Sequence, residues 1–166
     1  LLGQMSESGE RTLSELNLID NGPSADTNFV TELCIHQGIA RQVAATPDAL
    51  AVTFGSEQLT YAELDAQANR LAHKLVELGV GPEVRVGVAM PRSEQLLIAL
   101  LAVLKAGGAY VPLDATYPRE RLSYLMHDSG IALLLSDSSL RQVLPTQANL
   151  HVLELDQLDL RTQPQS

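Results

Sequence analysis

Apolar and polar positions alternate along the chain with the spacing of amphipathic helices, interrupted by short apolar runs. The clearest helical stripe lies between a capping box at Thr60–Glu63 and a glycine stop at Gly79. Its apolar positions are Leu64, Ala68, Leu71, Ala72, Leu75 and Leu78. The polar side, which is expected to face water, carries Asp65, Gln67, Arg70, Lys74 and Glu77. The pattern predicts a helix over about 60–78 with one buried face.

Two further helices follow at similar spacing. Ser93 is placed to cap the first, which is apolar almost all round from Leu96 to Leu104 and is therefore expected to be buried on several sides. Gly107 and Gly108 end it. Tyr117-Pro118 opens the second, with proline in the first turn and Gly130 at the end. Its predicted buried positions are Leu122, Leu125 and Met126.

Short runs rich in β-branched and aliphatic residues separate these helices. They predict strands at residues 49–54, 84–90, 109–113, 131–135 and 151–155. The run at 131–135 has no polar position, which is typical of a strand buried on both faces. Pro112 is best accommodated at a sheet edge. A turn at residues 55–57 with pairing by 58–60 predicts a hairpin, and shorter helices are expected at 31–45 and 139–143.

This alternation predicts an α/β domain with a mostly parallel sheet and flanking helices. Ligands of such sheets bind outside the carboxyl ends of the strands. Three polar segments are expected on that rim: residues 90–93, 114–117 and 136–138.

Composition narrows the function classes. The 166 residues are 45% hydrophobic and carry a formal net charge of −9. An acidic chain is a poor partner for nucleic acid or an anionic membrane, and the longest apolar run, Leu96–Leu104, is too short to span a bilayer. The single cysteine, Cys34, cannot form an internal disulfide, so a reducing, cytoplasmic location is expected.

A search for catalytic or ligand-binding residues assigns none. The sequence has no glycine-rich phosphate loop and no nucleophile elbow, and Gly107-Gly108 follows a helix, so it is interpreted as a packing and turn device. No histidine has metal-ligand spacing, and Cys34 and His36 would face apart on one helix. Asp114, at a strand end, is the best polar candidate, with a turn hydrogen bond or a helix cap as its expected role.

Two segments nevertheless resemble known motifs. Leu59-Thr60-Tyr61-Ala62-Glu63-Leu64 resembles the first core motif of nonribosomal peptide synthetase adenylation domains, and Leu104–Asp114 resembles the second, L-K-A-G-x-A-Y-V-P-[IL]-D. Residues 90–94, 117–122 and 34–48 are similar to neighbouring stretches of that family. Ala115 replaces a proline often found there.

The resemblance implies residues 29–166 as the incomplete first part of the large N-terminal subdomain, preceded by a linker at residues 1–28 that follows a condensation domain. Domains of this family use ATP and magnesium to form an aminoacyl adenylate, and a carrier-domain phosphopantetheine then accepts the acyl group. The upstream condensation domain, the remaining adenylation domain and the carrier domain are the implied partners. The amino acid activated is not indicated.

No position matches the family's phosphate-binding loop or its later ligand-binding residues, so no catalytic, cofactor or metal residue is carried over. We therefore expect a scaffold portion that is inactive alone. Two alternatives stay open: a fragment of an acyl-CoA ligase type of adenylate-forming enzyme, and a non-catalytic interaction module that uses an exposed sheet edge.

Overall fold

The computed structural model describes residues 34–146, 148 and 150–158. The predicted linker at 1–28 and the predicted start of the first helix at Thr31 lie outside this range. The helices and strands are α2 (Ile35–Ala45), β1 (Leu50–Phe54), β2 (Glu57–Thr60), α3 (Tyr61–Glu77), β3 (Arg85–Ala89), α4 (Glu94–Lys105), β4 (Ala109–Pro112), α5 (Arg119–Asp128), β5 (Leu133–Ser136), η2 (Ser138–Leu140), β6 (His151–Glu154) and η3 (Leu155–Gln157). Among these residues, no helix is long and apolar enough to cross a membrane.

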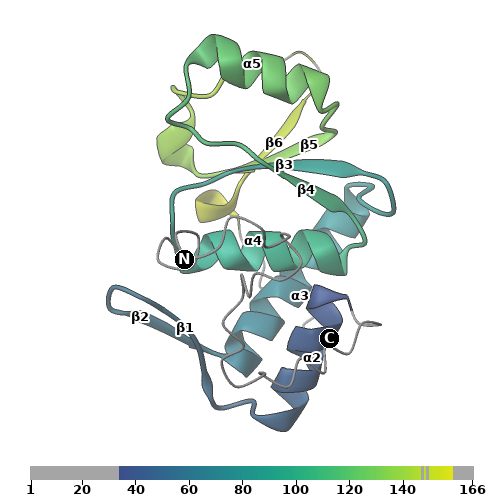
Figure 1. Cartoon of the computed structure of the whole chain (residues 1–166), viewed down its shortest axis with the longest axis vertical. Coiled ribbons are helices and arrows are strands. Elements are labelled where there is room, and N and C mark those ends of the chain that lie inside the picture. The colour runs from purple at the N-terminus through teal and green to yellow at the C-terminus, as the bar shows by residue number, and fades with distance from the viewer. Residues whose placement is uncertain (1–33, 147, 149, 159–166) are drawn as a thin grey trace, which may run out of the picture. The chain divides into compact units, whose positions relative to one another are not determined.

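The main sheet has four strands in the order β4-β3-β5-β6, and all three pairings are parallel. Helix α5 covers one face of this sheet, and α4 lies against the other (Figure 1). Each face has its own apolar cluster, which is why both helices carry a buried stripe. This arrangement confirms the predicted α/β class with a parallel sheet and flanking helices.

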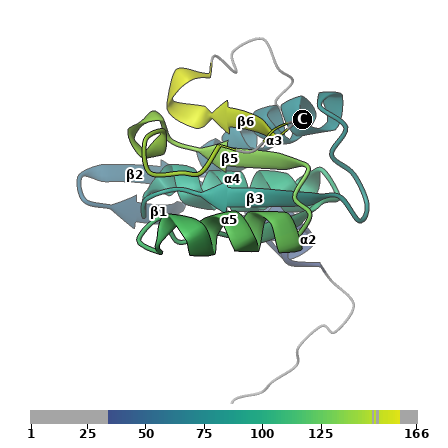
Figure 2. The ribbon, with the colours of Figure 1, turned by 90° about the horizontal axis from the view of Figure 1, so that it is seen from above.

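The central strand β5 connects the two halves of the core. Leu133 and Leu135 belong to the cluster shared with α3 and α4, and Leu134 belongs to the cluster beneath α5. All four residues of the strand are buried. In the sheet, β5 runs between β3 and β6 (Figure 2). Successive side chains of a strand point to opposite faces, so an uninterrupted apolar run is what a strand between two helical layers needs.

The glycines that end the helices adopt the left-handed conformation the sequence pattern requires. Gly79 has φ +88° and Gly107 has φ +83°. After α4, the Gly107 N–H donates to Leu104 O at 3.1 Å and the Gly108 N–H donates to Val103 O at 3.0 Å. This pair of bonds is a Schellman motif, which satisfies the last carbonyls of the helix and turns the chain into β4.

Both predicted caps are confirmed. Thr60 Oγ1 accepts from the Glu63 N–H at 3.2 Å, and Glu63 Oε2 accepts from the Thr60 N–H at 2.9 Å, completing the capping box of α3. The Thr60 N–H and the Thr60 hydroxyl, which also donates to Glu63 Oε2 at 3.0 Å, lower the pKa of Glu63. At α4, Ser93 Oγ accepts from the Leu96 N–H at 3.3 Å.

Several predicted boundaries are wrong by a few residues. Helix α5 begins at Arg119, because Pro118 has an extended backbone and serves as the N-cap. Strand β5 begins at Leu133, two residues later than predicted, after the chain leaves the left-handed turn at Gly130. The hairpin turn is tighter than predicted, since Glu57 already pairs with Phe54.

The two short helical predictions also need correction. Cys34 is the extended N-cap of α2, so it does not share the helix with His36, and its N–H donates to Gln37 Oε1 at 3.0 Å. The helix predicted at 139–143 is the single 3₁₀ turn η2, Ser138–Leu140. The first residue of this turn, Ser138, is bound by a residue far away in the sequence: the Ser138 N–H donates to Asp156 Oδ1.

Candidate functional site

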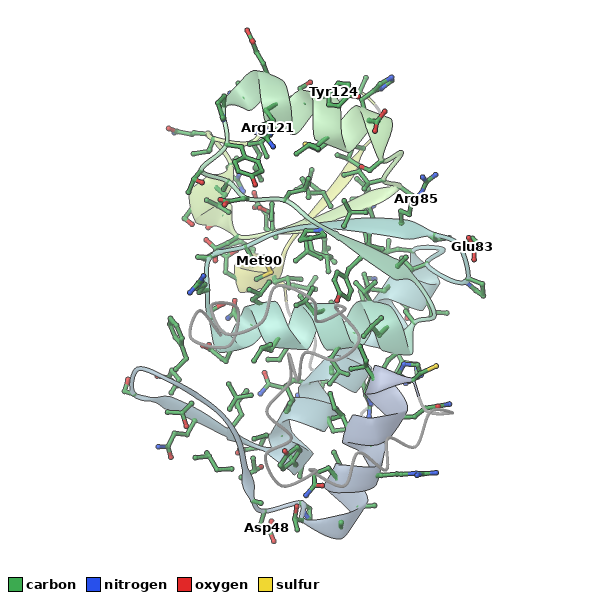
Figure 3. The ribbon with its side chains drawn as sticks, viewed as in Figure 1. Asp48, Glu83, Arg85, Met90, Arg121 and Tyr124 are labelled. Carbon is green, nitrogen blue, oxygen red and sulfur yellow. The ribbon has the colours of Figure 1, made fainter. Side chains whose placement is uncertain are left out.

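The carboxyl ends of the parallel strands form the rim at which a ligand is expected. A pocket on this rim is lined by Met90, Pro91, Arg92, Asp114, Ala115, Thr116 and Leu140. Met90 lies at one end of β3, and Arg85 marks the opposite end (Figure 3). Two of the three predicted rim segments, 90–93 and 114–117, therefore meet in one pocket, because β3 and β4 are parallel neighbours.

Asp114 follows β4 and closes a turn on the rim. Its Oδ1 accepts from the Thr116 backbone N–H at 2.9 Å and from Thr116 Oγ1 at 2.7 Å. These two bonds, with a smaller contribution from the nearby Arg92 charge, lower the pKa of Asp114. The carboxylate is therefore ionised at neutral pH and engaged in its own turn, which confirms the turn hydrogen bond expected from the sequence.

The third predicted rim segment lies in a different cluster. Ser136 is 1% exposed at the end of β5 and lines a separate pocket with Arg141 and Glu154. Arg141 binds the Glu154 carboxylate through both Nε, at 2.7 Å from Oε1, and Nη2. This pairing lowers the pKa of Glu154 and raises the pKa of Arg141.

Asp156 completes this second cluster. Ser138 donates to it from the backbone N–H at 2.8 Å and from Oγ at 2.5 Å, and Gln157 Nε2 donates at 2.9 Å. The Ser138 hydroxyl, the Gln157 amide and the Ser138 N–H lower the pKa of Asp156 to about 2. The cluster ties η2 to η3 and so fastens the crossover between β5 and β6.

The sequence search missed Arg141, Glu154 and Asp156. Arg141 and Glu154 are 13 positions apart, and Ser138 and Asp156 are 18 apart. No local spacing rule links residues at such distances. Their opposite charges near successive strand ends were the only available signal.

We expect acid to weaken the native state through Asp156. Its folded pKa of about 2 lies below the ordinary 3.8, so its contribution is present above about pH 4 and is lost as the pH falls toward 2. Urea unfolding measured between pH 5 and 2 should show a weaker pH dependence in Asp156→Asn than in the parent chain. Asp48→Asn, at a position outside this cluster, is the matched control, and identical slopes in Asp156→Asn and the parent would contradict the prediction.

Among the described residues, no group of three or more His, Cys, Asp or Glu side chains is arranged to hold a metal ion. Asp114 is committed to Thr116, and the pocket has one cationic side chain, Arg92. The described residues therefore do not fit a magnesium nucleotide by themselves. That no residue acts in catalysis or cofactor binding stays a prediction.

Gly107 and Gly108 lie at the far end of β4 from this rim. A Cβ placed at Gly108 would lie 2.7 Å from Val80 Cγ1 and 3.2 Å from the Val84 carbonyl oxygen. The absence of a side chain therefore serves close packing, as the sequence order of helix, glycine and strand predicts.

Comparisons with known proteins cover most of the chain. A family model described as AMP-binding enzyme matches residues 39–165. The chain is 42% identical over 151 aligned residues to gramicidin S synthase 2 of Brevibacillus brevis, covering 91% of the chain and 3% of that protein. It is 39% identical over 131 residues to the dimodular nonribosomal peptide synthase of Bacillus subtilis (strain 168), covering 79% of the chain and 6% of that protein.

Solved structures agree with this similarity. The crystal structure of the nonribosomal peptide synthetase FmoA3, in a form bound to α-methyl-L-serine-AMP, superposes with a TM-score of 0.75 at 36% identity. The match covers 81% of this chain and 15% of that one. The chain thus spans a small part of the length of each relative.

Proposed function

Because this chain belongs to the AMP-binding enzyme family, we propose that it is the N-terminal scaffold portion of an amino-acid-activating adenylation domain in a nonribosomal peptide synthetase. The family match over residues 39–165 carries this proposal. The synthetase relatives and the two motif-like segments, 59–64 and 104–114, support the peptide synthetase class over an acyl-CoA ligase.

The parent reaction joins an amino acid to the α-phosphate of ATP and releases pyrophosphate, and the acyl group then moves to a carrier-domain phosphopantetheine. Neutralising the phosphate charge needs a metal and cationic groups. Since the described residues do not form such a set, we assign that task to other parts of the parent domain. Residues 29–166 supply the sheet and its rim, and residues 1–28 link to an upstream condensation domain.

The cellular setting follows from the same proposal. A synthetase of this class works in the cytoplasm, where ATP and amino acids are available. Its partners are the condensation domain before it, the rest of its own adenylation domain and a carrier domain after it. Sequencing the coding region on both sides of this segment would test that order directly.

A chimera tests the scaffold role. Residues 34–158 would replace their counterpart in an adenylation domain of the dimodular synthase from Bacillus subtilis, and amino-acid-dependent ATP–pyrophosphate exchange would be measured. We expect exchange with the recipient's own amino acid, because the chain is 39% identical to that synthase over the aligned residues and, on this proposal, the specificity residues lie elsewhere. The 166-residue chain alone is expected to show no exchange.

Two controls make the result decisive. Binding of a non-hydrolysable aminoacyl adenylate analogue shows whether the chimera is folded. A folded chimera that binds the analogue but lacks exchange would refute the scaffold role. Exchange by the isolated 166-residue chain would refute the statement that the machinery lies outside it.

A further inference from the structure

Three polar side chains meet between α3 and the last residue of α4. The Lys105 ammonium Nζ donates to Asp65 Oδ1 at 2.7 Å and to Asn69 Oδ1 at 2.6 Å. Asn69 Nδ2 in turn donates to Asp65 Oδ2 at 3.0 Å. Both oxygens of the carboxylate are therefore used, and each member of the cluster contacts the other two.

This cluster is partly withdrawn from water, contrary to the sequence pattern that placed Asp65 on the exposed side of α3. The side chains of Lys105 and Asp65 are 15% and 19% exposed, whereas those of Lys74 and Glu77, another ion pair on α3, are 31% and 53% exposed. A charge removed from water is costly unless a partner compensates it. Loss of either charged partner would leave the other poorly solvated.

The buried stripes of the two helices mix alanines with larger aliphatic side chains, among them Leu71 and Leu75 on α3 and Leu101 on α4. Helix α3 buries Ala68 and Ala72, and α4 buries Ala99 and Ala102. Apolar contacts are non-directional, whereas a charge-assisted hydrogen bond needs its partners in one geometry. A fixed polar contact at one end can therefore decide which turn of α4 faces which turn of α3, as single buried polar residues do in coiled coils.

We propose that Lys105, Asp65 and Asn69 form a polar register pin that fixes α4 against α3. Lys105 is the last residue of α4, and only Ala106 separates it from the glycine turn that leads into β4. The pin thus sets where β4 starts on the sheet edge. It also joins the two motif-like segments physically, since Asp65 follows residues 59–64 and Lys105 lies within 104–114. This inference goes beyond the proposed function and does not depend on it.

The acylation rates of the lysine amines test the register pin directly, because Lys74 and Lys105 are the only two lysines of the chain. Acylation by N-hydroxysuccinimidyl acetate, followed by mass spectrometry, should modify Lys74 about tenfold faster than Lys105, since two charge-assisted hydrogen bonds hold the Lys105 amine. Asp65→Asn conserves size and removes the charge, and it should bring the two rates within about twofold. Glu77→Gln, which removes the exposed partner of Lys74, is the matched control and should change the ratio by less than about twofold.

Unfolding experiments separate a register pin from ordinary packing. Lys105→Met should raise the unfolding equilibrium constant about 10- to 100-fold, because Asp65 remains without its cation. Lys105→Met combined with Asp65→Leu should recover at least about half of that loss on a logarithmic scale. Hydrogen exchange at the amides of 107–111 should still be faster than in the parent chain, because the register is no longer fixed.

Each of the following results would overturn the proposal. One is equal acylation of the two lysines in the parent chain. A second is additive losses in the double variant, which would mean that Lys105 contributes only its methylene packing. A third is parent-like protection of 107–111 in a recovered double variant, which would mean that the apolar interface sets the register alone.

Discussion

Replacing Leu135 with alanine should lower the free energy of unfolding by about 2–5 kcal/mol, the usual range for a fully buried leucine. Leu135 is 0% exposed and belongs to the core cluster shared by α3, α4 and the sheet. Strand β5 has neighbours on both sides and helices on both faces, so little can move into the space the side chain leaves. The total free energy of unfolding of a small domain is about 5–15 kcal/mol, so this one substitution removes a large share of it.

Urea unfolding followed by circular dichroism would measure the loss. Val152→Ala is the matched control, since Val152 lies on the adjacent strand β6 and is 45% exposed. It should cost less than about 1 kcal/mol. Equal losses at the two positions would mean that β5 is not the buried centre of the sheet.

Replacing Gly108 with valine should lower the free energy of unfolding by about 3 kcal/mol, at the upper end of the range for overpacking. The new Cβ would lie 2.7 Å from Val80 Cγ1, and the next obstacle is the Val84 carbonyl oxygen at 3.2 Å. That carbonyl accepts the first hydrogen bond of β4, from the Ala109 N–H at 2.9 Å. Because a backbone group cannot rotate away, the clash should displace the start of β4.

Gly81→Ala provides the comparison, because a Cβ there meets no atom within 4 Å and the backbone φ is not left-handed. It should be neutral or stabilise by a few tenths of a kcal/mol. Thermal unfolding of the two variants, with hydrogen exchange at Ala109 to locate the disturbance, checks both values. A Gly108→Val chain as stable as Gly81→Ala would show that the α4–β4 turn is not tightly packed.

Sequence patterns predicted this fold well wherever the determining interaction is local. The capping box at Thr60 and the glycine stops at Gly79 and Gly107 depend on residues close together in the chain, so the periodicity located α3 and α4 accurately. The start of β5 was less predictable, because pairing with Val86 decides it, and Val86 is far away in sequence. The same applies to η2, which Asp156 holds from 18 positions downstream.

The position of the rim was predicted from the rule that ligands of parallel sheets bind outside the carboxyl ends of the strands. The structure places two of its three predicted segments in one pocket. The polar cluster of Lys105 was hidden for a different reason. Asp65 lies on the side of α3 that the single-helix pattern assigns to solvent, and only the arrival of α4 changes its surroundings and those of Asn69. Contacts between elements are beyond what one-dimensional periodicity can show.

Pro112 makes the two edge strands of the sheet, β4 and β6, unequal in their ability to pair with a further strand. The N–H groups of Ala109 and Leu113 donate inward to β3, at 2.9 Å each, so residues 110 and 112 direct their amide nitrogens outward. Position 112 has no hydrogen to offer, and a strand arriving beside β4 would find one outward donor, at Tyr110, among the four residues of that strand. Strand β6 contains no proline. Pro112 therefore disfavours unwanted strand addition between molecules at the β4 edge. The native pairing of β4 with β3 loses no hydrogen bond to this proline, because the nitrogen of residue 112 points outward.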